Sequence, residues 1–325
     1  MPTRSRRLLI AIGIGLFAAG ASWFATHRAA FGAEPDFHWT WVAAKAMLKG
    51  DNPYTVGSYY PLPAFIAAIP FTYLPSDVAT ALFSAVTSGI LAWVVTRTSY
   101  DRLPLFLSAS FAHGAVQGQW SMLLTAAVFA PSLSAAGAIK PNIGIAILAY
   151  RPTWRAAAAM LAFAALGLLI MPDWPKLWLA NFGGAPASGT AIHSSPLKSP
   201  AGVIALLALL RWRRPEARLL AAMAVVPQSP FVYEVLPLFA VAKTRFQTYA
   251  LVIGTDLALA YYALAPKKDM VAFFHNNGIA VFVCVYLPAL VLVLKRANEG
   301  DLPAFLERYS GWLPRWIRGK PALAA

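Results

Sequence analysis

The sequence predicts an all-α polytopic membrane protein, because its composition is apolar, its charges are few and its basic segments are regularly spaced. Hydrophobic residues make up 59% of the 325 residues and charged residues 12%, and the mean hydropathy is +0.58. Soluble domains carry about twice this share of charged residues. At about 20 residues per crossing, residues 1–325 form one domain with about nine to eleven transmembrane helices and short loops.

The first apolar run extends from Leu8 to Thr26 and follows Arg4, Arg6 and Arg7. Because more apolar runs follow, we expect a retained anchor with its N-terminus in the cytoplasm rather than a cleaved signal peptide. Later spans are expected near residues 78–97, 103–117, 119–132, 156–172, 200–211, 217–228, 230–242, 246–264 and 271–294.

Five later basic segments fit the same orientation, because Lys and Arg concentrate in cytoplasmic loops. They are residues 97–102, 151–155, 211–218, 243–245 and 295–296. Cytoplasmic loops therefore account for the net charge of +14, and we expect no nucleic acid partner. The predicted location is the inner (plasma) membrane, with membrane lipids around a multi-pass chain.

Two further segments belong to the cytoplasmic side in this topology. Residues 134–150 carry Lys140-Pro141 at their middle, so we expect the segment to dip into the membrane and return, which is tolerated beside a cavity. Residues 301–325 form a cytoplasmic tail. Within it, Trp, Leu and Ile alternate with basic residues up to Lys320, which predicts a short helix at the interface.

Two long segments, residues 27–77 and 173–199, fall on the opposite, external face and are rich in Trp, Tyr, Pro and Gly. In the first of them, apolar residues at helical spacing predict an amphipathic surface helix over 37–49. A second short apolar helix is expected over 62–74. Because the external face collects these segments, we expect function there.

Asp36 stands directly before the first of these helices in a chain with 13 acidic residues. A carboxylate at this position either caps the helix, whose dipole favours the charged form, or takes part in chemistry. Spacing alone leaves both interpretations open. Glu34 is the nearest competing acid.

Several chemistries lack the residues that they need. Cys284 is the single cysteine, so we expect neither a disulfide nor a thiolate metal site. The sequence has no paired-His metal motif and no glycine-rich phosphate loop. We therefore expect no metal, no cofactor and no nucleotide-sugar donor.

Three motifs follow one another over residues 36–150. They are Asp36-Phe37 continuing through Gly50-Asp51-Asn52-Pro53-Tyr54 to Tyr60-Pro61-Leu62-Pro63, then Gly118-Gln119, then Ala138-Ile139-Lys140-Pro141. In this order they resemble the N-terminal half of glycosyltransferase family 87, membrane enzymes of the GT-C architecture that use polyprenol-phosphate-mannose as donor. The later segment 229–234 departs from the family pattern, since Tyr233-Glu234 stands where a His is expected.

The resemblance implies a GT-C-like bundle with interfacial helices in the first external loop. It implies inverting transfer of a sugar, mannose in the first instance, from a polyprenyl-phosphate donor to a glycolipid or polysaccharide acceptor. Asp36 is then the general base, the one protein group that such a reaction requires when phosphate leaves. Lys140, at a helix break at membrane depth, and His193 are candidates for binding the donor phosphate. Substrate contacts are expected from Asp51, Tyr54, Tyr60, Gln119, Gln228, Tyr233 and Glu234.

Two other interpretations remain open. In a lipid or solute transporter, Lys140, Glu234 and Asp256 would be gating or coupling charges within the membrane. In a catalytically inactive relative of the transferases, the departure at Tyr233-Glu234 would mark the loss of activity. The long, aromatic, acid-bearing first external segment favours the enzyme.

Overall fold

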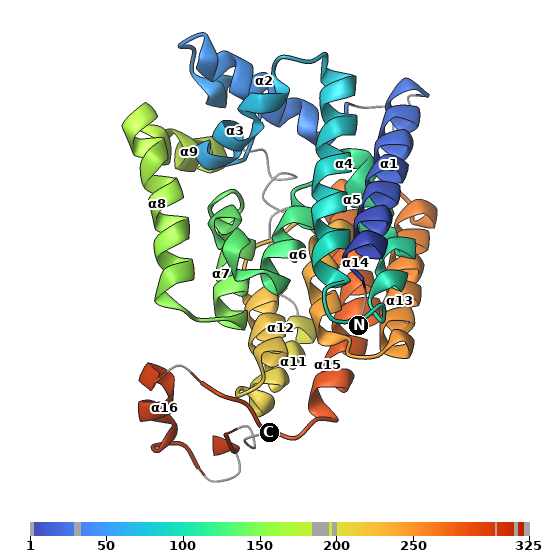
Figure 1. Ribbon diagram of the computed structural model, residues 1–325, viewed down its shortest axis with the longest axis vertical. Coiled ribbons are helices and arrows are strands. Elements are labelled where there is room, and N and C mark those ends of the chain that lie inside the picture. The colour runs from blue at the N-terminus through green and yellow to red at the C-terminus, as the bar shows by residue number, and fades with distance from the viewer. Residues whose placement is uncertain are drawn as a thin grey trace.

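The structure is a computed structural model that describes residues 3–28, 34–183, 195–196, 200–302, 304–314 and 318–321. All the secondary-structure elements within these ranges are helices. Glu299 and Lys320 form an isolated β-bridge. The predicted all-α class is confirmed (Figure 1).

The α-helices are α1 (Arg4–His27), α2 (Asp36–Leu48), α3 (Leu62–Ala68), α4 (Ser76–Val95), α5 (Ala109–Gln117), α6 (Ser121–Phe129), α7 (Pro141–Tyr150), α8 (Trp154–Ile170), α9 (Trp174–Gly183), α11 (Pro200–Ala205), α12 (Pro215–Val225), α13 (Arg245–Leu264), α14 (Met270–Val281), α15 (Leu287–Leu294) and α16 (Ala304–Ser310). Tighter 3-10 segments are η1 (Pro53–Val56), η2 (Ile69–Phe71), η3 (Leu103–Leu107), η4 (Pro131–Ala138), η6 (Leu206–Arg211) and η7 (Val232–Val241), and η8 (Phe282–Tyr286) is a π-helix.

Three helical stretches are long and apolar enough to cross a membrane: α1, α4 and the continuous run Met270–Leu294 that contains α14, η8 and α15. A fourth is obtained if α8 and α9, which meet at a bend of 99°, count as one span. Several apolar helices of the chain could therefore span a membrane.

Of the other expected spans, 246–264 is the continuous helix α13, and the rest are shorter or interrupted helices in the described part of the chain. The expected span 103–117 is divided into η3 and α5, and 230–242 is the 3-10 segment η7, which contains Pro237. The expected external helix 62–74 ends early, as α3 followed by η2. Hydropathy detects apolar runs, but prolines such as Pro104 and Pro131 remove backbone donors and restart the helix within them.

Helix α1 packs along α4 through small residues. A Cβ at Gly15 would lie 2.9 Å from the Ala85 carbonyl oxygen, and one at Gly89 would lie 3.2 Å from the Ala11 carbonyl oxygen. Ala11 and Ala18 are buried on the same face of α1. Small residues let two apolar helices approach closely, as in membrane helix pairs. The first helix is thus fastened to the body of the protein (Figure 1).

Helix α2 lies across one end of the bundle (Figure 1). Aromatic packing holds it there. Phe37, which is 1% exposed, stacks on Phe83 of α4 with ring centroids 4.1 Å apart and meets Phe71 edge-on. Phe83 in turn contacts the Trp120 ring. The prediction of an amphipathic helix over 37–49 is confirmed, with Phe37, Thr40, Ala43 and Ala44 on its buried face.

The chain reverses direction at Lys140. Segment η4 and helix α7 fold back on each other, and a Cβ at Gly144 would lie 2.3 Å from the Gly137 carbonyl oxygen. Pro141 occupies the first turn of α7, where a missing N–H costs no intrahelical bond. The chain reversal that the prediction requires within residues 134–150 is therefore present, with Lys140 at its turning point, and the dip into a membrane stays a prediction.

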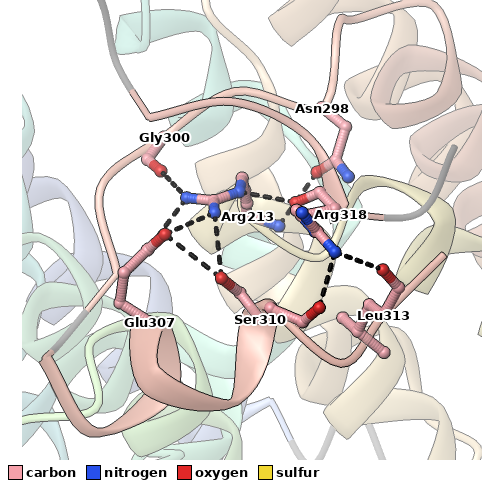
Figure 2. Close-up of polar contacts among 8 residues, drawn as sticks. Arg213, Asn298, Gly300, Glu307, Ser310, Leu313 and Arg318 are labelled. Atoms are coloured by element: carbon pink, nitrogen blue, oxygen red, sulfur yellow. Dashed lines mark hydrogen bonds and ion pairs between the residues drawn. The ribbon is translucent and has the colours of Figure 1, made fainter. Parts of the chain in front are cut away.

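The basic segments meet at the end of the molecule opposite α2. Glu216 pairs with Arg296 at 2.7 Å and with Lys243 at 3.4 Å, and Arg218 donates to the Ala149 carbonyl at 2.8 Å. The tail packs on this end through Arg213. Figure 2 shows its guanidinium inside a ring of polar groups that includes Glu307, Gly300 and Ser310.

Candidate functional site

A cavity of about 540 Å³ lies between residues 36–61, the chain reversal at Lys140 and the start of η7. Nine of its lining residues carry aromatic or polar side chains that recur below: Asp36, Trp39, Tyr60, Lys140, Asn142, Trp178, Ser229, Tyr233 and Glu234. Six of the residues that the sequence proposed as site residues are brought together here. They are Asp36, Tyr60, Gln119, Lys140, Tyr233 and Glu234.

Asp36 is the first residue of α2, and its carboxylate turns toward the cavity because Phe37 is fixed in the aromatic cluster on the other side. The helix is preceded by Pro35 and has no side-chain cap. The interpretation of Asp36 as a helix cap is therefore wrong. Its carboxylate instead accepts hydrogen bonds from Gln119 Nε2 and, at 3.4 Å, from the Tyr233 hydroxyl.

Gln119 reaches Asp36 through the sharp turn at Gly118. Gly118 ends α5 with φ of 63°, and a Cβ there would lie 2.7 Å from Phe37 Cβ. Only glycine combines this backbone conformation with so close an approach. Gln119 is 1% exposed, and its Oε1 accepts a hydrogen bond from the Tyr60 hydroxyl at 3.0 Å. The Gly118-Gln119 motif thus links α2, the segment that contains Tyr60, and α6.

Lys140 lies on the same cavity and forms an ion pair with Glu234. Glu234 Oε1 also accepts a hydrogen bond from Ser229 Oγ at 2.8 Å. The Lys140 ammonium sits 5.7 Å from the Tyr60 ring centroid and 5.9 Å from that of Tyr233. Aromatic faces attract a cation at such distances. The side chain is 14% exposed, so its charge borders the cavity.

Burial raises the pKa of the Asp36 carboxyl above its ordinary value. The positive charge of Lys140 is the strongest influence that opposes burial and lowers the pKa, and the hydrogen bonds from Tyr233 and Gln119 act in the same direction. Burial also holds the pKa of the Tyr60 hydroxyl well above its ordinary value. The cavity therefore combines a carboxylate able to take a proton, neutral hydrogen-bond donors and one cation able to bind an anion.

Other predicted site residues lie elsewhere. Gln228 is 5% exposed and donates to the Tyr286 hydroxyl at 2.5 Å, so it belongs to the packing beside a smaller cavity. Asp51 is exposed in the turn after α2. Tyr54 is buried against Phe65 with ring centroids 5.5 Å apart. None of these three lines the large cavity. His193 lies outside the described residues.

Asp256, proposed as a coupling charge in a transporter, also lies apart from the cavity. Its carboxylate accepts a hydrogen bond from the Ala109 backbone N–H at 2.7 Å, at the start of α5. Asp256 is therefore not among the residues that line the cavity with Lys140 and Glu234.

Three residues of the site were missed by sequence reasoning. Ser229 holds Glu234, Gln117 Oε1 accepts from the Asp36 backbone N–H at 3.1 Å, and Asn142 Nδ2 donates to the Pro227 carbonyl at 2.5 Å. Ser229 is the first residue of the segment 229–234 and Asn142 follows Lys140-Pro141, so proximity in sequence was an available signal. Gln117 carried none.

Comparisons with protein-family models, with curated proteins and with solved structures found no match to this chain. The resemblance to the glycosyltransferases thus stays a prediction that rests on the motifs of residues 36–150.

Proposed function

We propose that this protein is a membrane glycosyltransferase with a GT-C-like bundle. It transfers a sugar, mannose in the first instance, from a polyprenyl-phosphate donor to a glycolipid or polysaccharide acceptor. The observation that carries the proposal is that Asp36 and Lys140 border one cavity of about 540 Å³. Such a cavity offers a base and a phosphate-binding cation to the same ligand.

In the proposed reaction, Asp36 accepts the proton of an acceptor hydroxyl while the hydroxyl oxygen attacks C1 of the donor sugar. The bond between C1 and the phosphate oxygen breaks, and the electron pair leaves with the phosphate. Attack from the face opposite the phosphate inverts the configuration at C1. Phosphate leaves as a stabilised anion beside Lys140, so no second acid is required.

The remaining polar groups suit the recognition of a sugar. Tyr60 and Gln119 form a hydrogen-bonded pair at the base, and Tyr233 completes the contacts of Asp36. Trp39 and Trp178 present indole rings to the cavity, whose faces can stack on a sugar ring. In this proposal these residues orient C1 toward the acceptor.

The proposal places the cavity on the external face. The basic segments that pack around Glu216 lie at the opposite end of the molecule, and the positive-inside rule assigns that end to the cytoplasm. The N-terminus is then cytoplasmic as well. The donor lipid enters from the bilayer.

The proposal is tested by transfer of radiolabelled mannose from polyprenyl-phosphate-mannose, with membranes that contain the protein and lipid or polysaccharide acceptors. Asp36→Asn is expected to lower transfer by about 100-fold to 10,000-fold, the usual contribution of a general base. Glu34→Gln is the matched control, because Glu34 is an exposed acid two residues away that does not line the cavity. Equal transfer by wild type and Asp36→Asn would refute the assignment.

A further inference from the structure

We propose that Glu234 makes the cavity select a singly charged phosphodiester over a doubly charged phosphomonoester. In the transfer reaction the donor lipid is the phosphodiester, and the lipid phosphate left after transfer is the monoester. Glu234 is then a residue that sets ligand specificity and favours product release. The inference rests on the proposed function.

Lys140 has a fixed acidic partner in the cavity. The Lys140 ammonium forms an ion pair with Glu234, which compensates its charge. Glu234 is 3% exposed, and Ser229 fixes the same carboxylate oxygen that contacts Lys140. Lys140 therefore attracts a ligand phosphate less strongly than an unpaired lysine would, because the fixed Glu234 carboxylate offsets its charge.

The cavity contains more acidic than basic side chains. Asp36 and Glu234 supply two carboxylates and Lys140 supplies one ammonium, while Tyr60 and Tyr233 supply neutral hydroxyls. When both acids are ionised, the cavity carries one more negative than positive group. Each further negative charge on a ligand is repelled, more strongly than in water because the surroundings are of low dielectric constant.

The charge of the lipid ligand changes during the reaction. A phosphodiester carries one negative charge, whereas a phosphomonoester carries nearly two at neutral pH because its second pKa is about 6. Transfer of the sugar leaves the acceptor's proton on Asp36, and once Asp36 has released that proton the cavity repels the lipid phosphate more strongly than it repels the donor. Specificity of this kind comes from a repulsive group placed against the unwanted ligand.

The test measures binding of two short lipids to the purified protein at pH 8 by calorimetry. Farnesyl methyl phosphate represents the phosphodiester, and farnesyl phosphate represents the monoester. For the wild type we expect the diester to bind about tenfold more tightly, the size of one additional repulsion across such a cavity. For Glu234→Gln we expect the preference to disappear or reverse, because Lys140 is then unshared.

Glu216→Gln is the matched control, since Glu216 is another buried glutamate in a Lys and Arg network, at the opposite end of the molecule. It is expected to keep the wild-type preference. The inference is overturned if the wild type binds the monoester as tightly as the diester, a comparison that needs no variant to fold. It is also overturned if Glu234→Gln keeps the tenfold preference. If the wild type binds neither lipid, the proposed phosphate-lipid site itself fails.

Discussion

At the scale of single residues, Asp36 is tuned by two opposing effects. Burial against the aromatic cluster raises the pKa of its carboxyl, and Lys140 is the largest influence that lowers it. A base works best when its pKa lies closer to the working pH than that of a solvated aspartate. Because the pKa of Asp36 is higher in the folded protein than in the unfolded chain, folding favours the protonated carboxyl. The resulting contribution to the free energy of unfolding is lost as pH rises through the folded pKa.

The first prediction concerns the pH dependence of transfer. Activity of the wild type should rise with pH as Asp36 loses its proton, with a midpoint above the ordinary aspartate value of 3.8. Lys140→Gln removes the positive charge that lowers this pKa, so the midpoint should move to higher pH and the maximal rate should fall. Rates between pH 4 and pH 9 measure both effects. An unchanged midpoint in Lys140→Gln would contradict the electrostatic coupling.

The second prediction concerns Gly118, which brings Gln119 to Asp36. Gly118→Ala introduces a methyl group 2.7 Å from Phe37 Cβ in a left-handed backbone conformation. We expect a loss of about 2–4 kcal/mol in the free energy of unfolding from strain and overpacking together, and a loss of transfer. Gly50→Ala is the control, because Gly50 has φ of +82° but no atom within 4 Å of the added methyl group. Equal costs at the two glycines would exclude the close approach as the cause.

At the scale of elements, the contact between α1 and α4 depends on residues without side-chain bulk. Gly15→Leu should therefore force the helices apart and lower the thermal unfolding temperature in detergent, because backbone and not a flexible side chain faces the new atoms. Gly13→Leu is the matched control, since nothing lies within 4 Å of a Cβ at Gly13. Similar melting of the two variants would show that the packing is not decisive.

The C-terminal tail is a second element with a defined attachment, shown in Figure 2. Hydrogen bonds from the buried Arg213 guanidinium hold the pKa of Glu307 below its usual value. A lowered folded pKa stabilises the attachment above the unfolded pKa, and this contribution is lost as pH falls through the folded value.

Glu307→Gln should accordingly release the tail at neutral pH, measured as faster proteolysis between residues 298 and 320. Arg308→Gln, an exposed neighbour, should leave proteolysis unchanged. A tail that stays equally protected in both variants would argue against the Arg213 attachment as its anchor.

At the scale of the whole molecule, the sequence predicted regular elements well where helical periodicity and hydropathy agree. Expected segments 78–97, 246–264 and 271–294 correspond to α4, α13 and the run Met270–Leu294. Three or four stretches of the described residues are long and apolar enough to span a membrane, and the number of about nine to eleven spans stays a prediction. Several expected spans are divided, because hydropathy does not register the prolines and 3-10 turns within apolar runs. α13 is long, yet it is less apolar than the three stretches that could span a membrane.

Some residues of the cavity could be predicted from the sequence, but their contacts could not. Asp36, Gln119 and Lys140 belong to the recognised motifs, and the structure places all three around one site. Their spacing of tens of residues contains no information on which side chains meet. Long-range packing decides which of these side chains meet. It brings Gln119 to Asp36 and Glu234 to Lys140. It also turns Gln228 away from the cavity, toward Tyr286.

The most direct test of the central claim follows the two halves of the donor separately. Purified protein in liposomes is given polyprenyl-phosphate-mannose labelled with ³H in the sugar and ³²P in the phosphate, together with an acceptor. The account predicts that the wild type separates the labels, with ³H on the acceptor and ³²P on the lipid, and that Asp36→Asn leaves them joined. Labels that cross the membrane together, equally in both proteins, would contradict a transferase and indicate a transporter.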